Sequence, residues 1–115
     1  MKHLLAIVAA TTALSGCAGL ITGGELIRPG EPTGYIQVVN QTRGPVNAVL
    51  ISSCDASTYG LNRLPSGTSI AQGSSYSFQV SAGCWDVAAG TTGVGDARQR
   101  FNVPAGGTFR YTVTQ

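Results

Sequence analysis

The sequence predicts an all-β fold, a small antiparallel β-sandwich or partly open barrel of about six strands. From residue 35 onward, apolar and polar side chains alternate, which is the pattern of strands that bury one face. Charged residues make up only 10% of the chain and glycine contributes 16 residues, a composition that favours short strands and tight turns. No segment repeats apolar residues at helical spacing.

The predicted strands follow one another at short intervals. The first, YIQVV at 35–39, is separated from the second, VNAVLIS at 46–52, by a turn that contains Gly44 and Pro45. We expect these two strands to form an antiparallel hairpin. The later strands are SYSFQVS at 75–81, CWDVAA at 84–89, RQRFNV at 98–103 and TFRYTVT at 108–114. The apolar residues that alternation puts on one face are Tyr76, Phe78 and Val80 in 75–81, and Phe109, Tyr111 and Val113 in 108–114.

The N-terminus has the pattern of a signal peptide. A basic start is followed by an apolar run over 4–14, which is shorter than the ~20 residues that a permanent membrane-spanning helix needs. The run ends in LSGC at 14–17, which resembles the bacterial lipobox, a Leu followed by two small residues and an obligatory Cys. The resemblance implies that residues 1–16 are a cleaved lipoprotein signal peptide. Cys17 would then be the lipidated first residue of the mature protein, because its thiol accepts the lipid.

Lipidation of Cys17 predicts where the protein is located. More than one acyl chain, at ~0.8 kcal/mol per buried methylene, gives stable membrane anchoring. Residue 18 is Ala and not the Asp that retains lipoproteins in the inner membrane of enteric-type bacteria. The similarity to that sorting rule implies the outer membrane, with the domain facing the periplasm.

Two segments follow the signal peptide. Residues 17–34 hold the lipidated Cys and a tether rich in glycine and proline, and residues 35–115 form a single β-sandwich-like domain. The tether also contains large apolar side chains, which a disordered linker usually lacks. Part of it therefore either lies on the domain or lies near the membrane surface. These apolar residues are Leu20, Ile21, Leu26 and Ile27.

The two remaining cysteines predict a disulfide. Once Cys17 is acylated, Cys54 and Cys84 are left in a compartment that oxidises thiols. Both lie at the ends of predicted strands, where two packed strands could bring their Cα atoms within the ~5 to 6 Å that a disulfide spans. The alternative is a pair of buried free thiols. Closing a loop of about 30 residues would stabilise the fold by roughly 3 to 4 kcal/mol.

Several short motifs occur in order between residues 39 and 87. They are Asn40-Gln41-Thr42, a strand ending in Ser52, the loop Tyr59-Gly60-Leu61-Asn62-Arg63-Leu64, Gly73, and Cys84-Trp85-Asp86. This stretch resembles a family of small exported bacterial β-proteins of unknown function. The loop aromatic is Tyr59 here and more usually Trp in that family, which implies some divergence in packing. The resemblance implies a fold and no activity.

Side chains suited to catalysis or metal binding are scarce. The single His3 and the single lysine, Lys2, leave with the signal peptide, so no ordinary base remains to activate a serine. We therefore expect no enzyme activity, no metal site and no cofactor. The glycine-rich GTTGVG at 90–95 lacks the Lys and the helix of a phosphate-binding loop and indicates a hairpin connection. A catalytic pair of carboxylates is the alternative, but Glu25 and Glu31 lie in the tether and Asp96 in a glycine-rich loop, so we interpret the acidic residues as solvated. The remaining acidic residues are Asp55 and Asp86.

Two function classes remain. A nucleic-acid surface is not expected, because the net charge is only +2 and the arginines are scattered singly. The first class is a non-catalytic, lipid-anchored envelope protein that binds an envelope protein or a glycan or supports the envelope. The second is an inhibitor-like or defence lipoprotein that presents a disulfide-held loop to a foreign enzyme.

The predicted partner loop is the connection 55–66, the longest irregular stretch between strands. It carries Tyr59, Asn62 and Arg63, residue types that are common in interface hot spots. The alternative is that Tyr59 and Leu64 fold inward and plug the open end of the sandwich.

Overall fold

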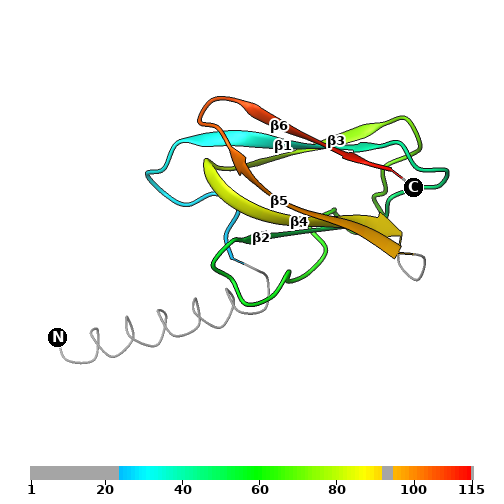
Figure 1. Cartoon of the computed structure of the whole chain (residues 1–115), viewed down its shortest axis with the longest axis horizontal. Helices are drawn as coiled ribbons and strands as arrows, with labels where there is room; N and C mark the ends of the chain where they lie inside the picture. Colours follow the sequence, from blue (N-terminus) through cyan, green and yellow to red (C-terminus); the bar gives the residue numbers. More distant parts are fainter. Residues whose placement is uncertain (1–23, 92–94, 115) are drawn as a thin grey trace.

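Two three-stranded sheets pack face to face in the computed structural model, which describes residues 24–91 and 95–114 (Figure 1). One sheet has the order β3-β1-β6 and the other has the order β2-β4-β5. The strands are β1 (Thr33–Asn40), β2 (Ala48–Ser53), β3 (Ser75–Ser81), β4 (Gly83–Thr91), β5 (Gly95–Val103) and β6 (Thr108–Val113). The predicted all-β sandwich of six strands is confirmed.

The strand pairing differs from the expected pairing at β1. This strand pairs with β3 in antiparallel fashion and with β6 in parallel fashion, while β2 pairs with β4 in the other sheet. The predicted hairpin between 35–39 and 46–52 is therefore wrong, and the sandwich is not wholly antiparallel. By contrast, β4 and β5 form an antiparallel hairpin in which Thr91 is opposite Gly95, as GTTGVG predicted.

The buried side chain of Asn40 holds together the turn at which the chain leaves the first sheet. Its Nδ2 donates hydrogen bonds to the carbonyl oxygens of Gly44 and Ile70, both at 2.8 Å. Its Oδ1 accepts hydrogen bonds from the backbone N of Thr42 at 2.9 Å and from the Thr42 hydroxyl at 2.6 Å. These bonds fold residues 40–44 into a compact turn, and Val46 then forms a bridge with Ile70. The chain therefore crosses to the second sheet and does not fold back along β1.

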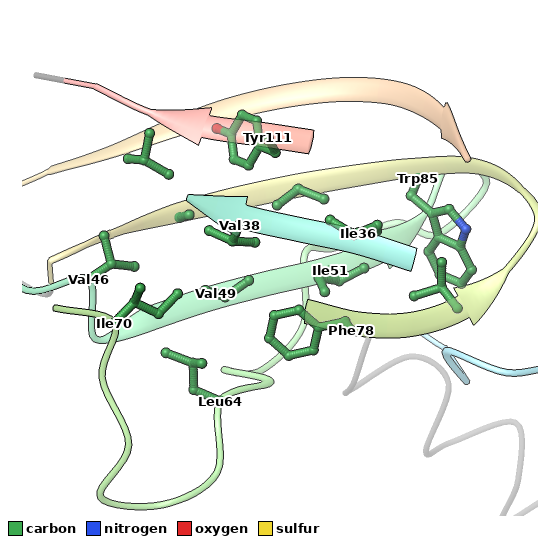
Figure 2. Packing of buried hydrophobic residues seen from close by; sticks show 14 of the residues in the cluster. Ile36, Val38, Val46, Val49, Ile51, Leu64, Ile70, Phe78, Trp85 and Tyr111 are labelled. Carbon is green, nitrogen blue, oxygen red and sulfur yellow. The ribbon is translucent and has the colours of Figure 1, made fainter. Parts of the chain in front are cut away.

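The hydrophobic core lies between the two sheets (Figure 2). It is built from the faces that the alternation of apolar residues predicted, so Phe78 and Val80 on β3 and Tyr111 and Val113 on β6 are buried. Burial raises the pKa of Tyr111 to about 12. The largest fully buried side chains include Trp85, Ile36, Ile51, Ile70, Val38, Val46 and Val49.

The two long sides of the sandwich are closed in different ways. On the side of β2 and β3, the connection between these strands contributes Leu64 and Ile70 to the core (Figure 2). On the side of β5 and β6, the rings of Phe101 and Phe109 stack with centroids 3.8 Å apart, and the Tyr111 ring lies 6.0 Å from Phe101. The edge strand of the second sheet on the first of these sides is β2, and the irregular β2–β3 connection lies next to it.

The described part of the predicted tether lies on the domain. Leu26 packs against the core and its carbonyl oxygen accepts a hydrogen bond from the backbone N of Ser81 at 2.7 Å. The backbone N of Arg28 donates to the Ser81 hydroxyl, also at 2.7 Å. The predicted signal peptide at 1–16 and Cys17 lie outside the described residues. Nothing in 24–91 or 95–114 forms a helix long and apolar enough to cross a membrane.

Candidate functional site

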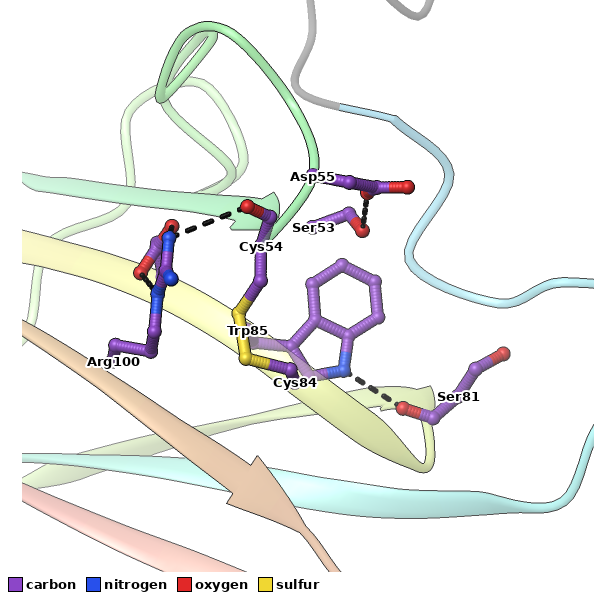
Figure 3. Close-up of a disulfide and its surroundings, with 8 residues drawn as sticks. Ser53, Cys54, Asp55, Ser81, Cys84, Trp85 and Arg100 are labelled. Atoms are coloured by element: carbon purple, nitrogen blue, oxygen red, sulfur yellow. Dashed lines mark hydrogen bonds and ion pairs between the residues drawn. A yellow bond between two sulfur atoms is a disulfide. The ribbon is translucent and has the colours of Figure 1, made fainter.

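Cys54 and Cys84 form the predicted disulfide (Figure 3). Cys54 directly follows β2 and Cys84 is the second residue of β4, and their Cα atoms are 5.6 Å apart. Because Ser53 is opposite Trp85 in the β2–β4 ladder, the bridge ties together the ends of two strands that are already neighbours. It fixes the start of the connection that we predicted to bind a partner.

Trp85 supports the disulfide from inside the sandwich. Its side chain is fully buried, and its Nε1 donates a hydrogen bond to the carbonyl oxygen of Ser81 at 2.8 Å (Figure 3). The guanidinium of Arg28 lies over the ring, with Cζ 5.1 Å from the ring centroid, in cation–π geometry. The indole therefore joins β4 to the end of β3 and to the segment before β1.

An ion pair, Arg100 with Asp86, and a hydrogen bond, Ser53 with Asp55, lie near the disulfide (Figure 3). Arg100 on β5 binds the Asp86 carboxylate through Nε at 2.8 Å and Nη2 at 3.0 Å, and its Nη2 also donates to the carbonyl oxygen of Cys54 at 3.3 Å. The Ser53 hydroxyl donates to the carboxylate of Asp55, which lowers the pKa of Asp55. Arg100 is thus linked to the first residue after β2.

The side chain of Asn62 is bonded to the exposed edge of β2. Its Oδ1 accepts from the backbone N of Val49 at 2.8 Å and from the backbone N of Leu64 at 3.1 Å, and its Nδ2 donates to the carbonyl oxygen of Asn47 at 2.9 Å. Asn62 also forms a backbone bridge with Leu50. The connection therefore runs along β2 like a short additional strand and satisfies groups that an edge strand would leave unpaired.

Arg63 is directed to the same edge. Its backbone N donates to the carbonyl oxygen of Val49 at 2.7 Å. Its guanidinium donates to the carbonyl oxygen of Ile51 through Nε at 3.1 Å and Nη2 at 2.8 Å, and Nη2 also donates to the carbonyl oxygen of Gly24 at 2.6 Å. Partial burial lowers the pKa of Arg63. The amide of Asn62 and the Nε and Nη2 atoms of Arg63, two of the three predicted contact residues, thus form hydrogen bonds within the chain.

The side chains of Tyr59 and Leu61 are more exposed than that of Leu64. Leu64 belongs to the core, whereas Tyr59 is half-buried beneath Arg98, whose Cζ lies 4.9 Å from the Tyr59 ring centroid. Leu61 is 57% exposed, which makes it the large apolar side chain that this connection presents to solvent. Our sequence reasoning did not select Leu61. Its position next to Asn62 is the feature that could have identified it. Neighbouring residues of an extended segment point in opposite directions, so Leu61 points away from β2 where Asn62 points toward it.

An open hollow of about 490 Å³ adjoins the disulfide. Besides Cys54 and Cys84, it is lined by Gly24, Glu25, Arg28, Ser53 and Asp55. The hydroxyl of Ser53 faces a carboxylate whose pKa is lowered, and such a carboxylate is a weak base. Among residues 24–91 and 95–114, no group of three His, Cys, Asp or Glu side chains is placed to hold a metal ion. The Ser53–Asp55 pair in this hollow is therefore poorly suited to proton transfer.

A comparison of the chain with models of known protein families, with curated proteins and with solved structures finds no match.

Proposed function

We propose that this protein is a non-catalytic, lipid-anchored component of the bacterial cell envelope, in which the β-sandwich acts as a binding or structural module. The lipid on Cys17 would hold it at the outer membrane, facing the periplasm. Its partner would be another envelope protein or a glycan, and it would need no cofactor.

The disulfide is the observation that carries this proposal. Cys54 and Cys84 are the cysteines that remain once Cys17 is acylated, and they are paired. Structural disulfides persist in exported proteins and are rare in the reducing cytosol, so the pairing supports export. The sequence after His3 contains neither histidine nor lysine, which supports a non-catalytic role.

Replacing Cys17 with alanine is expected to leave a full-length precursor without lipid. The thiol of Cys17 is the acyl acceptor in the proposed processing, so cleavage before residue 17 should fail with it. Intact mass spectrometry of the protein extracted from membranes would measure both effects. The double variant C54A/C84A is the matched control, because it removes two thiols and should still be lipidated. A wild-type protein that is water-soluble and begins at another residue would contradict the proposed anchor.

A second candidate function, an inhibitor-like or defence lipoprotein, is favoured by the presentation of Leu61. This side chain is 57% exposed on a connection that is held by the disulfide at Cys54 and by the contacts of Asn62 and Arg63 with β2. A loop that is already rigid loses little conformational entropy when it enters an enzyme cleft. It could therefore place one apolar side chain in a pocket.

If this second function is correct, Leu61→Ser should abolish capture of an added lysozyme by the solubilised protein while leaving the melting temperature unchanged. Ile27→Ser is the matched control, because Ile27 is a comparably exposed apolar residue, at 47%, outside the connection. Capture can be measured by pulldown of the purified enzyme. Failure of the wild-type protein to retain the lysozyme, or equal loss in both variants, would count against this function.

A further inference from the structure

The outer face of the β3-β1-β6 sheet is uncharged except for one arginine. Because Ile36 and Val38 of β1 point into the core, the alternate residues Tyr35 and Gln37 point to solvent. The ladders place them in two rows across the sheet. One row is Gln79, Tyr35 and Thr108, and the other is Ser77, Gln37 and Arg110. We call these six residues the Tyr35 face.

Tyr35 gives this face an aromatic surface. Its side chain is 45% exposed in the middle strand of the sheet, with Gln79 and Thr108 on either side. The sheet does not depend on its ring for core packing, because β1 contributes Ile36 and Val38 to the core. The ring of an exposed tyrosine presents an apolar surface next to a polar hydroxyl, a combination that suits ligands with both characters.

Hydrogen-bonding groups surround the ring. The Nε2 of Gln37 donates to the Ser75 hydroxyl at 3.3 Å, and the Nε2 of Gln79 donates to the Thr33 hydroxyl at 3.2 Å. These bonds orient both amides and leave an Oε1 on each to accept further hydrogen bonds. The face thus combines fixed amides with hydroxyl groups, which match the alternating donors and acceptors of sugar hydroxyls.

Arg110 gives the face a net positive charge. The three strands of this sheet contain no Asp or Glu, and Arg110 has no carboxylate partner within the described residues. In contrast, Arg28, Arg98 and Arg100 each pair with a carboxylate. The guanidinium of Arg110 is therefore available for a carboxylate from outside the chain, which it could bind through two parallel hydrogen bonds.

We propose that the Tyr35 face binds a polysaccharide strand that carries carboxylate groups. The Tyr35 ring would stack on the C–H face of one sugar ring, Gln37 and Gln79 would bond hydroxyls, and Arg110 would pair with a carboxylate. Tyr35 and Gln37 lie two residues apart on β1, about 7 Å, so one or two consecutive sugars of the strand would contact this face. This inference rests on the proposed binding function and deepens it, because it names the chemical class of the glycan and the surface that binds it. It does not require the lipid anchor.

The test measures binding of polygalacturonate, a linear polymer of carboxylated sugars, to the purified full-length protein in detergent by isothermal titration calorimetry. Dextran supplies sugars without carboxylates, and polyglutamate supplies carboxylates without sugars. We expect polygalacturonate to bind, dextran to bind about tenfold more weakly for the loss of one contact worth ~1.4 kcal/mol, and polyglutamate not to bind.

Variants separate stacking from general charge attraction. Tyr35→Ala should weaken polygalacturonate binding at least about tenfold, whereas Tyr35→Phe, which keeps the ring, should bind like the wild type. Arg110→Gln should weaken polygalacturonate to the level of dextran. Arg43→Gln is the matched control, because Arg43 is exposed, has no carboxylate partner in the described structure and lies in the turn after β1. It should change nothing, and all variants should melt like the wild type.

Several results would overturn the inference. Equal losses in Arg110→Gln and Arg43→Gln would mean that net charge alone attracts the polymer. Polyglutamate binding as tightly as polygalacturonate would remove the role of the sugar. Wild-type affinity in Tyr35→Ala, or no binding of any polysaccharide, would reject the face as a glycan site, and the second result would leave a protein partner for it. The unlipidated Cys17→Ala protein should bind normally, so failure of the anchor proposal is distinguishable from failure of this one.

Discussion

Replacing both Cys54 and Cys84 with alanine is expected to lower the free energy of unfolding by roughly 3 to 4 kcal/mol. The disulfide closes a loop between residues 30 positions apart, and in the chain-entropy model the bridge removes conformations mainly from the unfolded chain. A domain of this size has a total stability of about 5 to 10 kcal/mol, so the bridge contributes a large share of it. The variant should remain folded at room temperature and melt well below the wild type.

Urea unfolding of the wild type, of the reduced wild type and of C54A/C84A would measure this loss. The reduced wild type and the double variant should have the same free energy of unfolding, because both lack the bridge. The reduced wild type keeps the sulfur atoms, so it controls for their removal in the double variant. The slope of the unfolding free energy against urea should rise without the bridge, since the unfolded chain then exposes more surface. Thiols that label fully in the unfolded, unreduced wild type would show that the bridge is absent and would remove the basis of this expectation.

Asn40→Ala is expected to destabilise the fold by about 3 kcal/mol, because an unpaired buried polar group costs ~1 to 3 kcal/mol. Asn40 is 0% exposed, and its amide bonds the carbonyl oxygens of Gly44 and Ile70 as well as the backbone N and the hydroxyl of Thr42. Alanine would leave these four partners without Asn40, although Thr42 keeps its bond to the Gly44 carbonyl oxygen. The turn between the two sheets would therefore lose much of its support.

Chemical denaturation of purified Asn40→Ala measures this effect. Asn102→Ala, at an exposed position on β5, is the matched control and should change stability by less than about 0.5 kcal/mol. Asn40→Asp should also destabilise, because a carboxylate keeps the acceptor for Thr42 but loses both donated hydrogen bonds. A loss below about 1 kcal/mol in Asn40→Ala would mean that the turn does not depend on this amide.

The sequence predicted the strands well and their pairing poorly. A period of two identifies the buried face, which is why Phe78, Val80, Tyr111 and Val113 are found in the core. The same period says nothing about which strand is the neighbour, and the prediction of a hairpin across Gly44 and Pro45 used proximity in the sequence alone. The turn that crosses to the other sheet contains the hydrogen bonds of one buried amide, Asn40, and these are visible only in three dimensions.

Of the candidate site, the disulfide could be predicted from the sequence, whereas the positions of the loop side chains could not. The disulfide followed from two cysteines at strand ends in a chain that we predict to be exported, since few alternatives exist for such a pair. The positions of Asn62 and Arg63 did not follow, because a polar side chain that bonds the edge of β2 has the same sequence pattern as one that faces solvent. The exposed Leu61 was missed because a leucine in a β-protein is usually assigned to the core.

The position of β1 has a consequence for the order in which the protein folds. The first strand lies between β3 and the last strand, β6, and its parallel register pairs Tyr35 with Thr108. The β3-β1-β6 sheet is therefore incomplete until β6 has been synthesised, and contacts so distant in sequence form slowly. Under the lipoprotein export that we propose, this delay would keep the β3-β1-β6 sheet open until the polypeptide has passed through a narrow translocation channel.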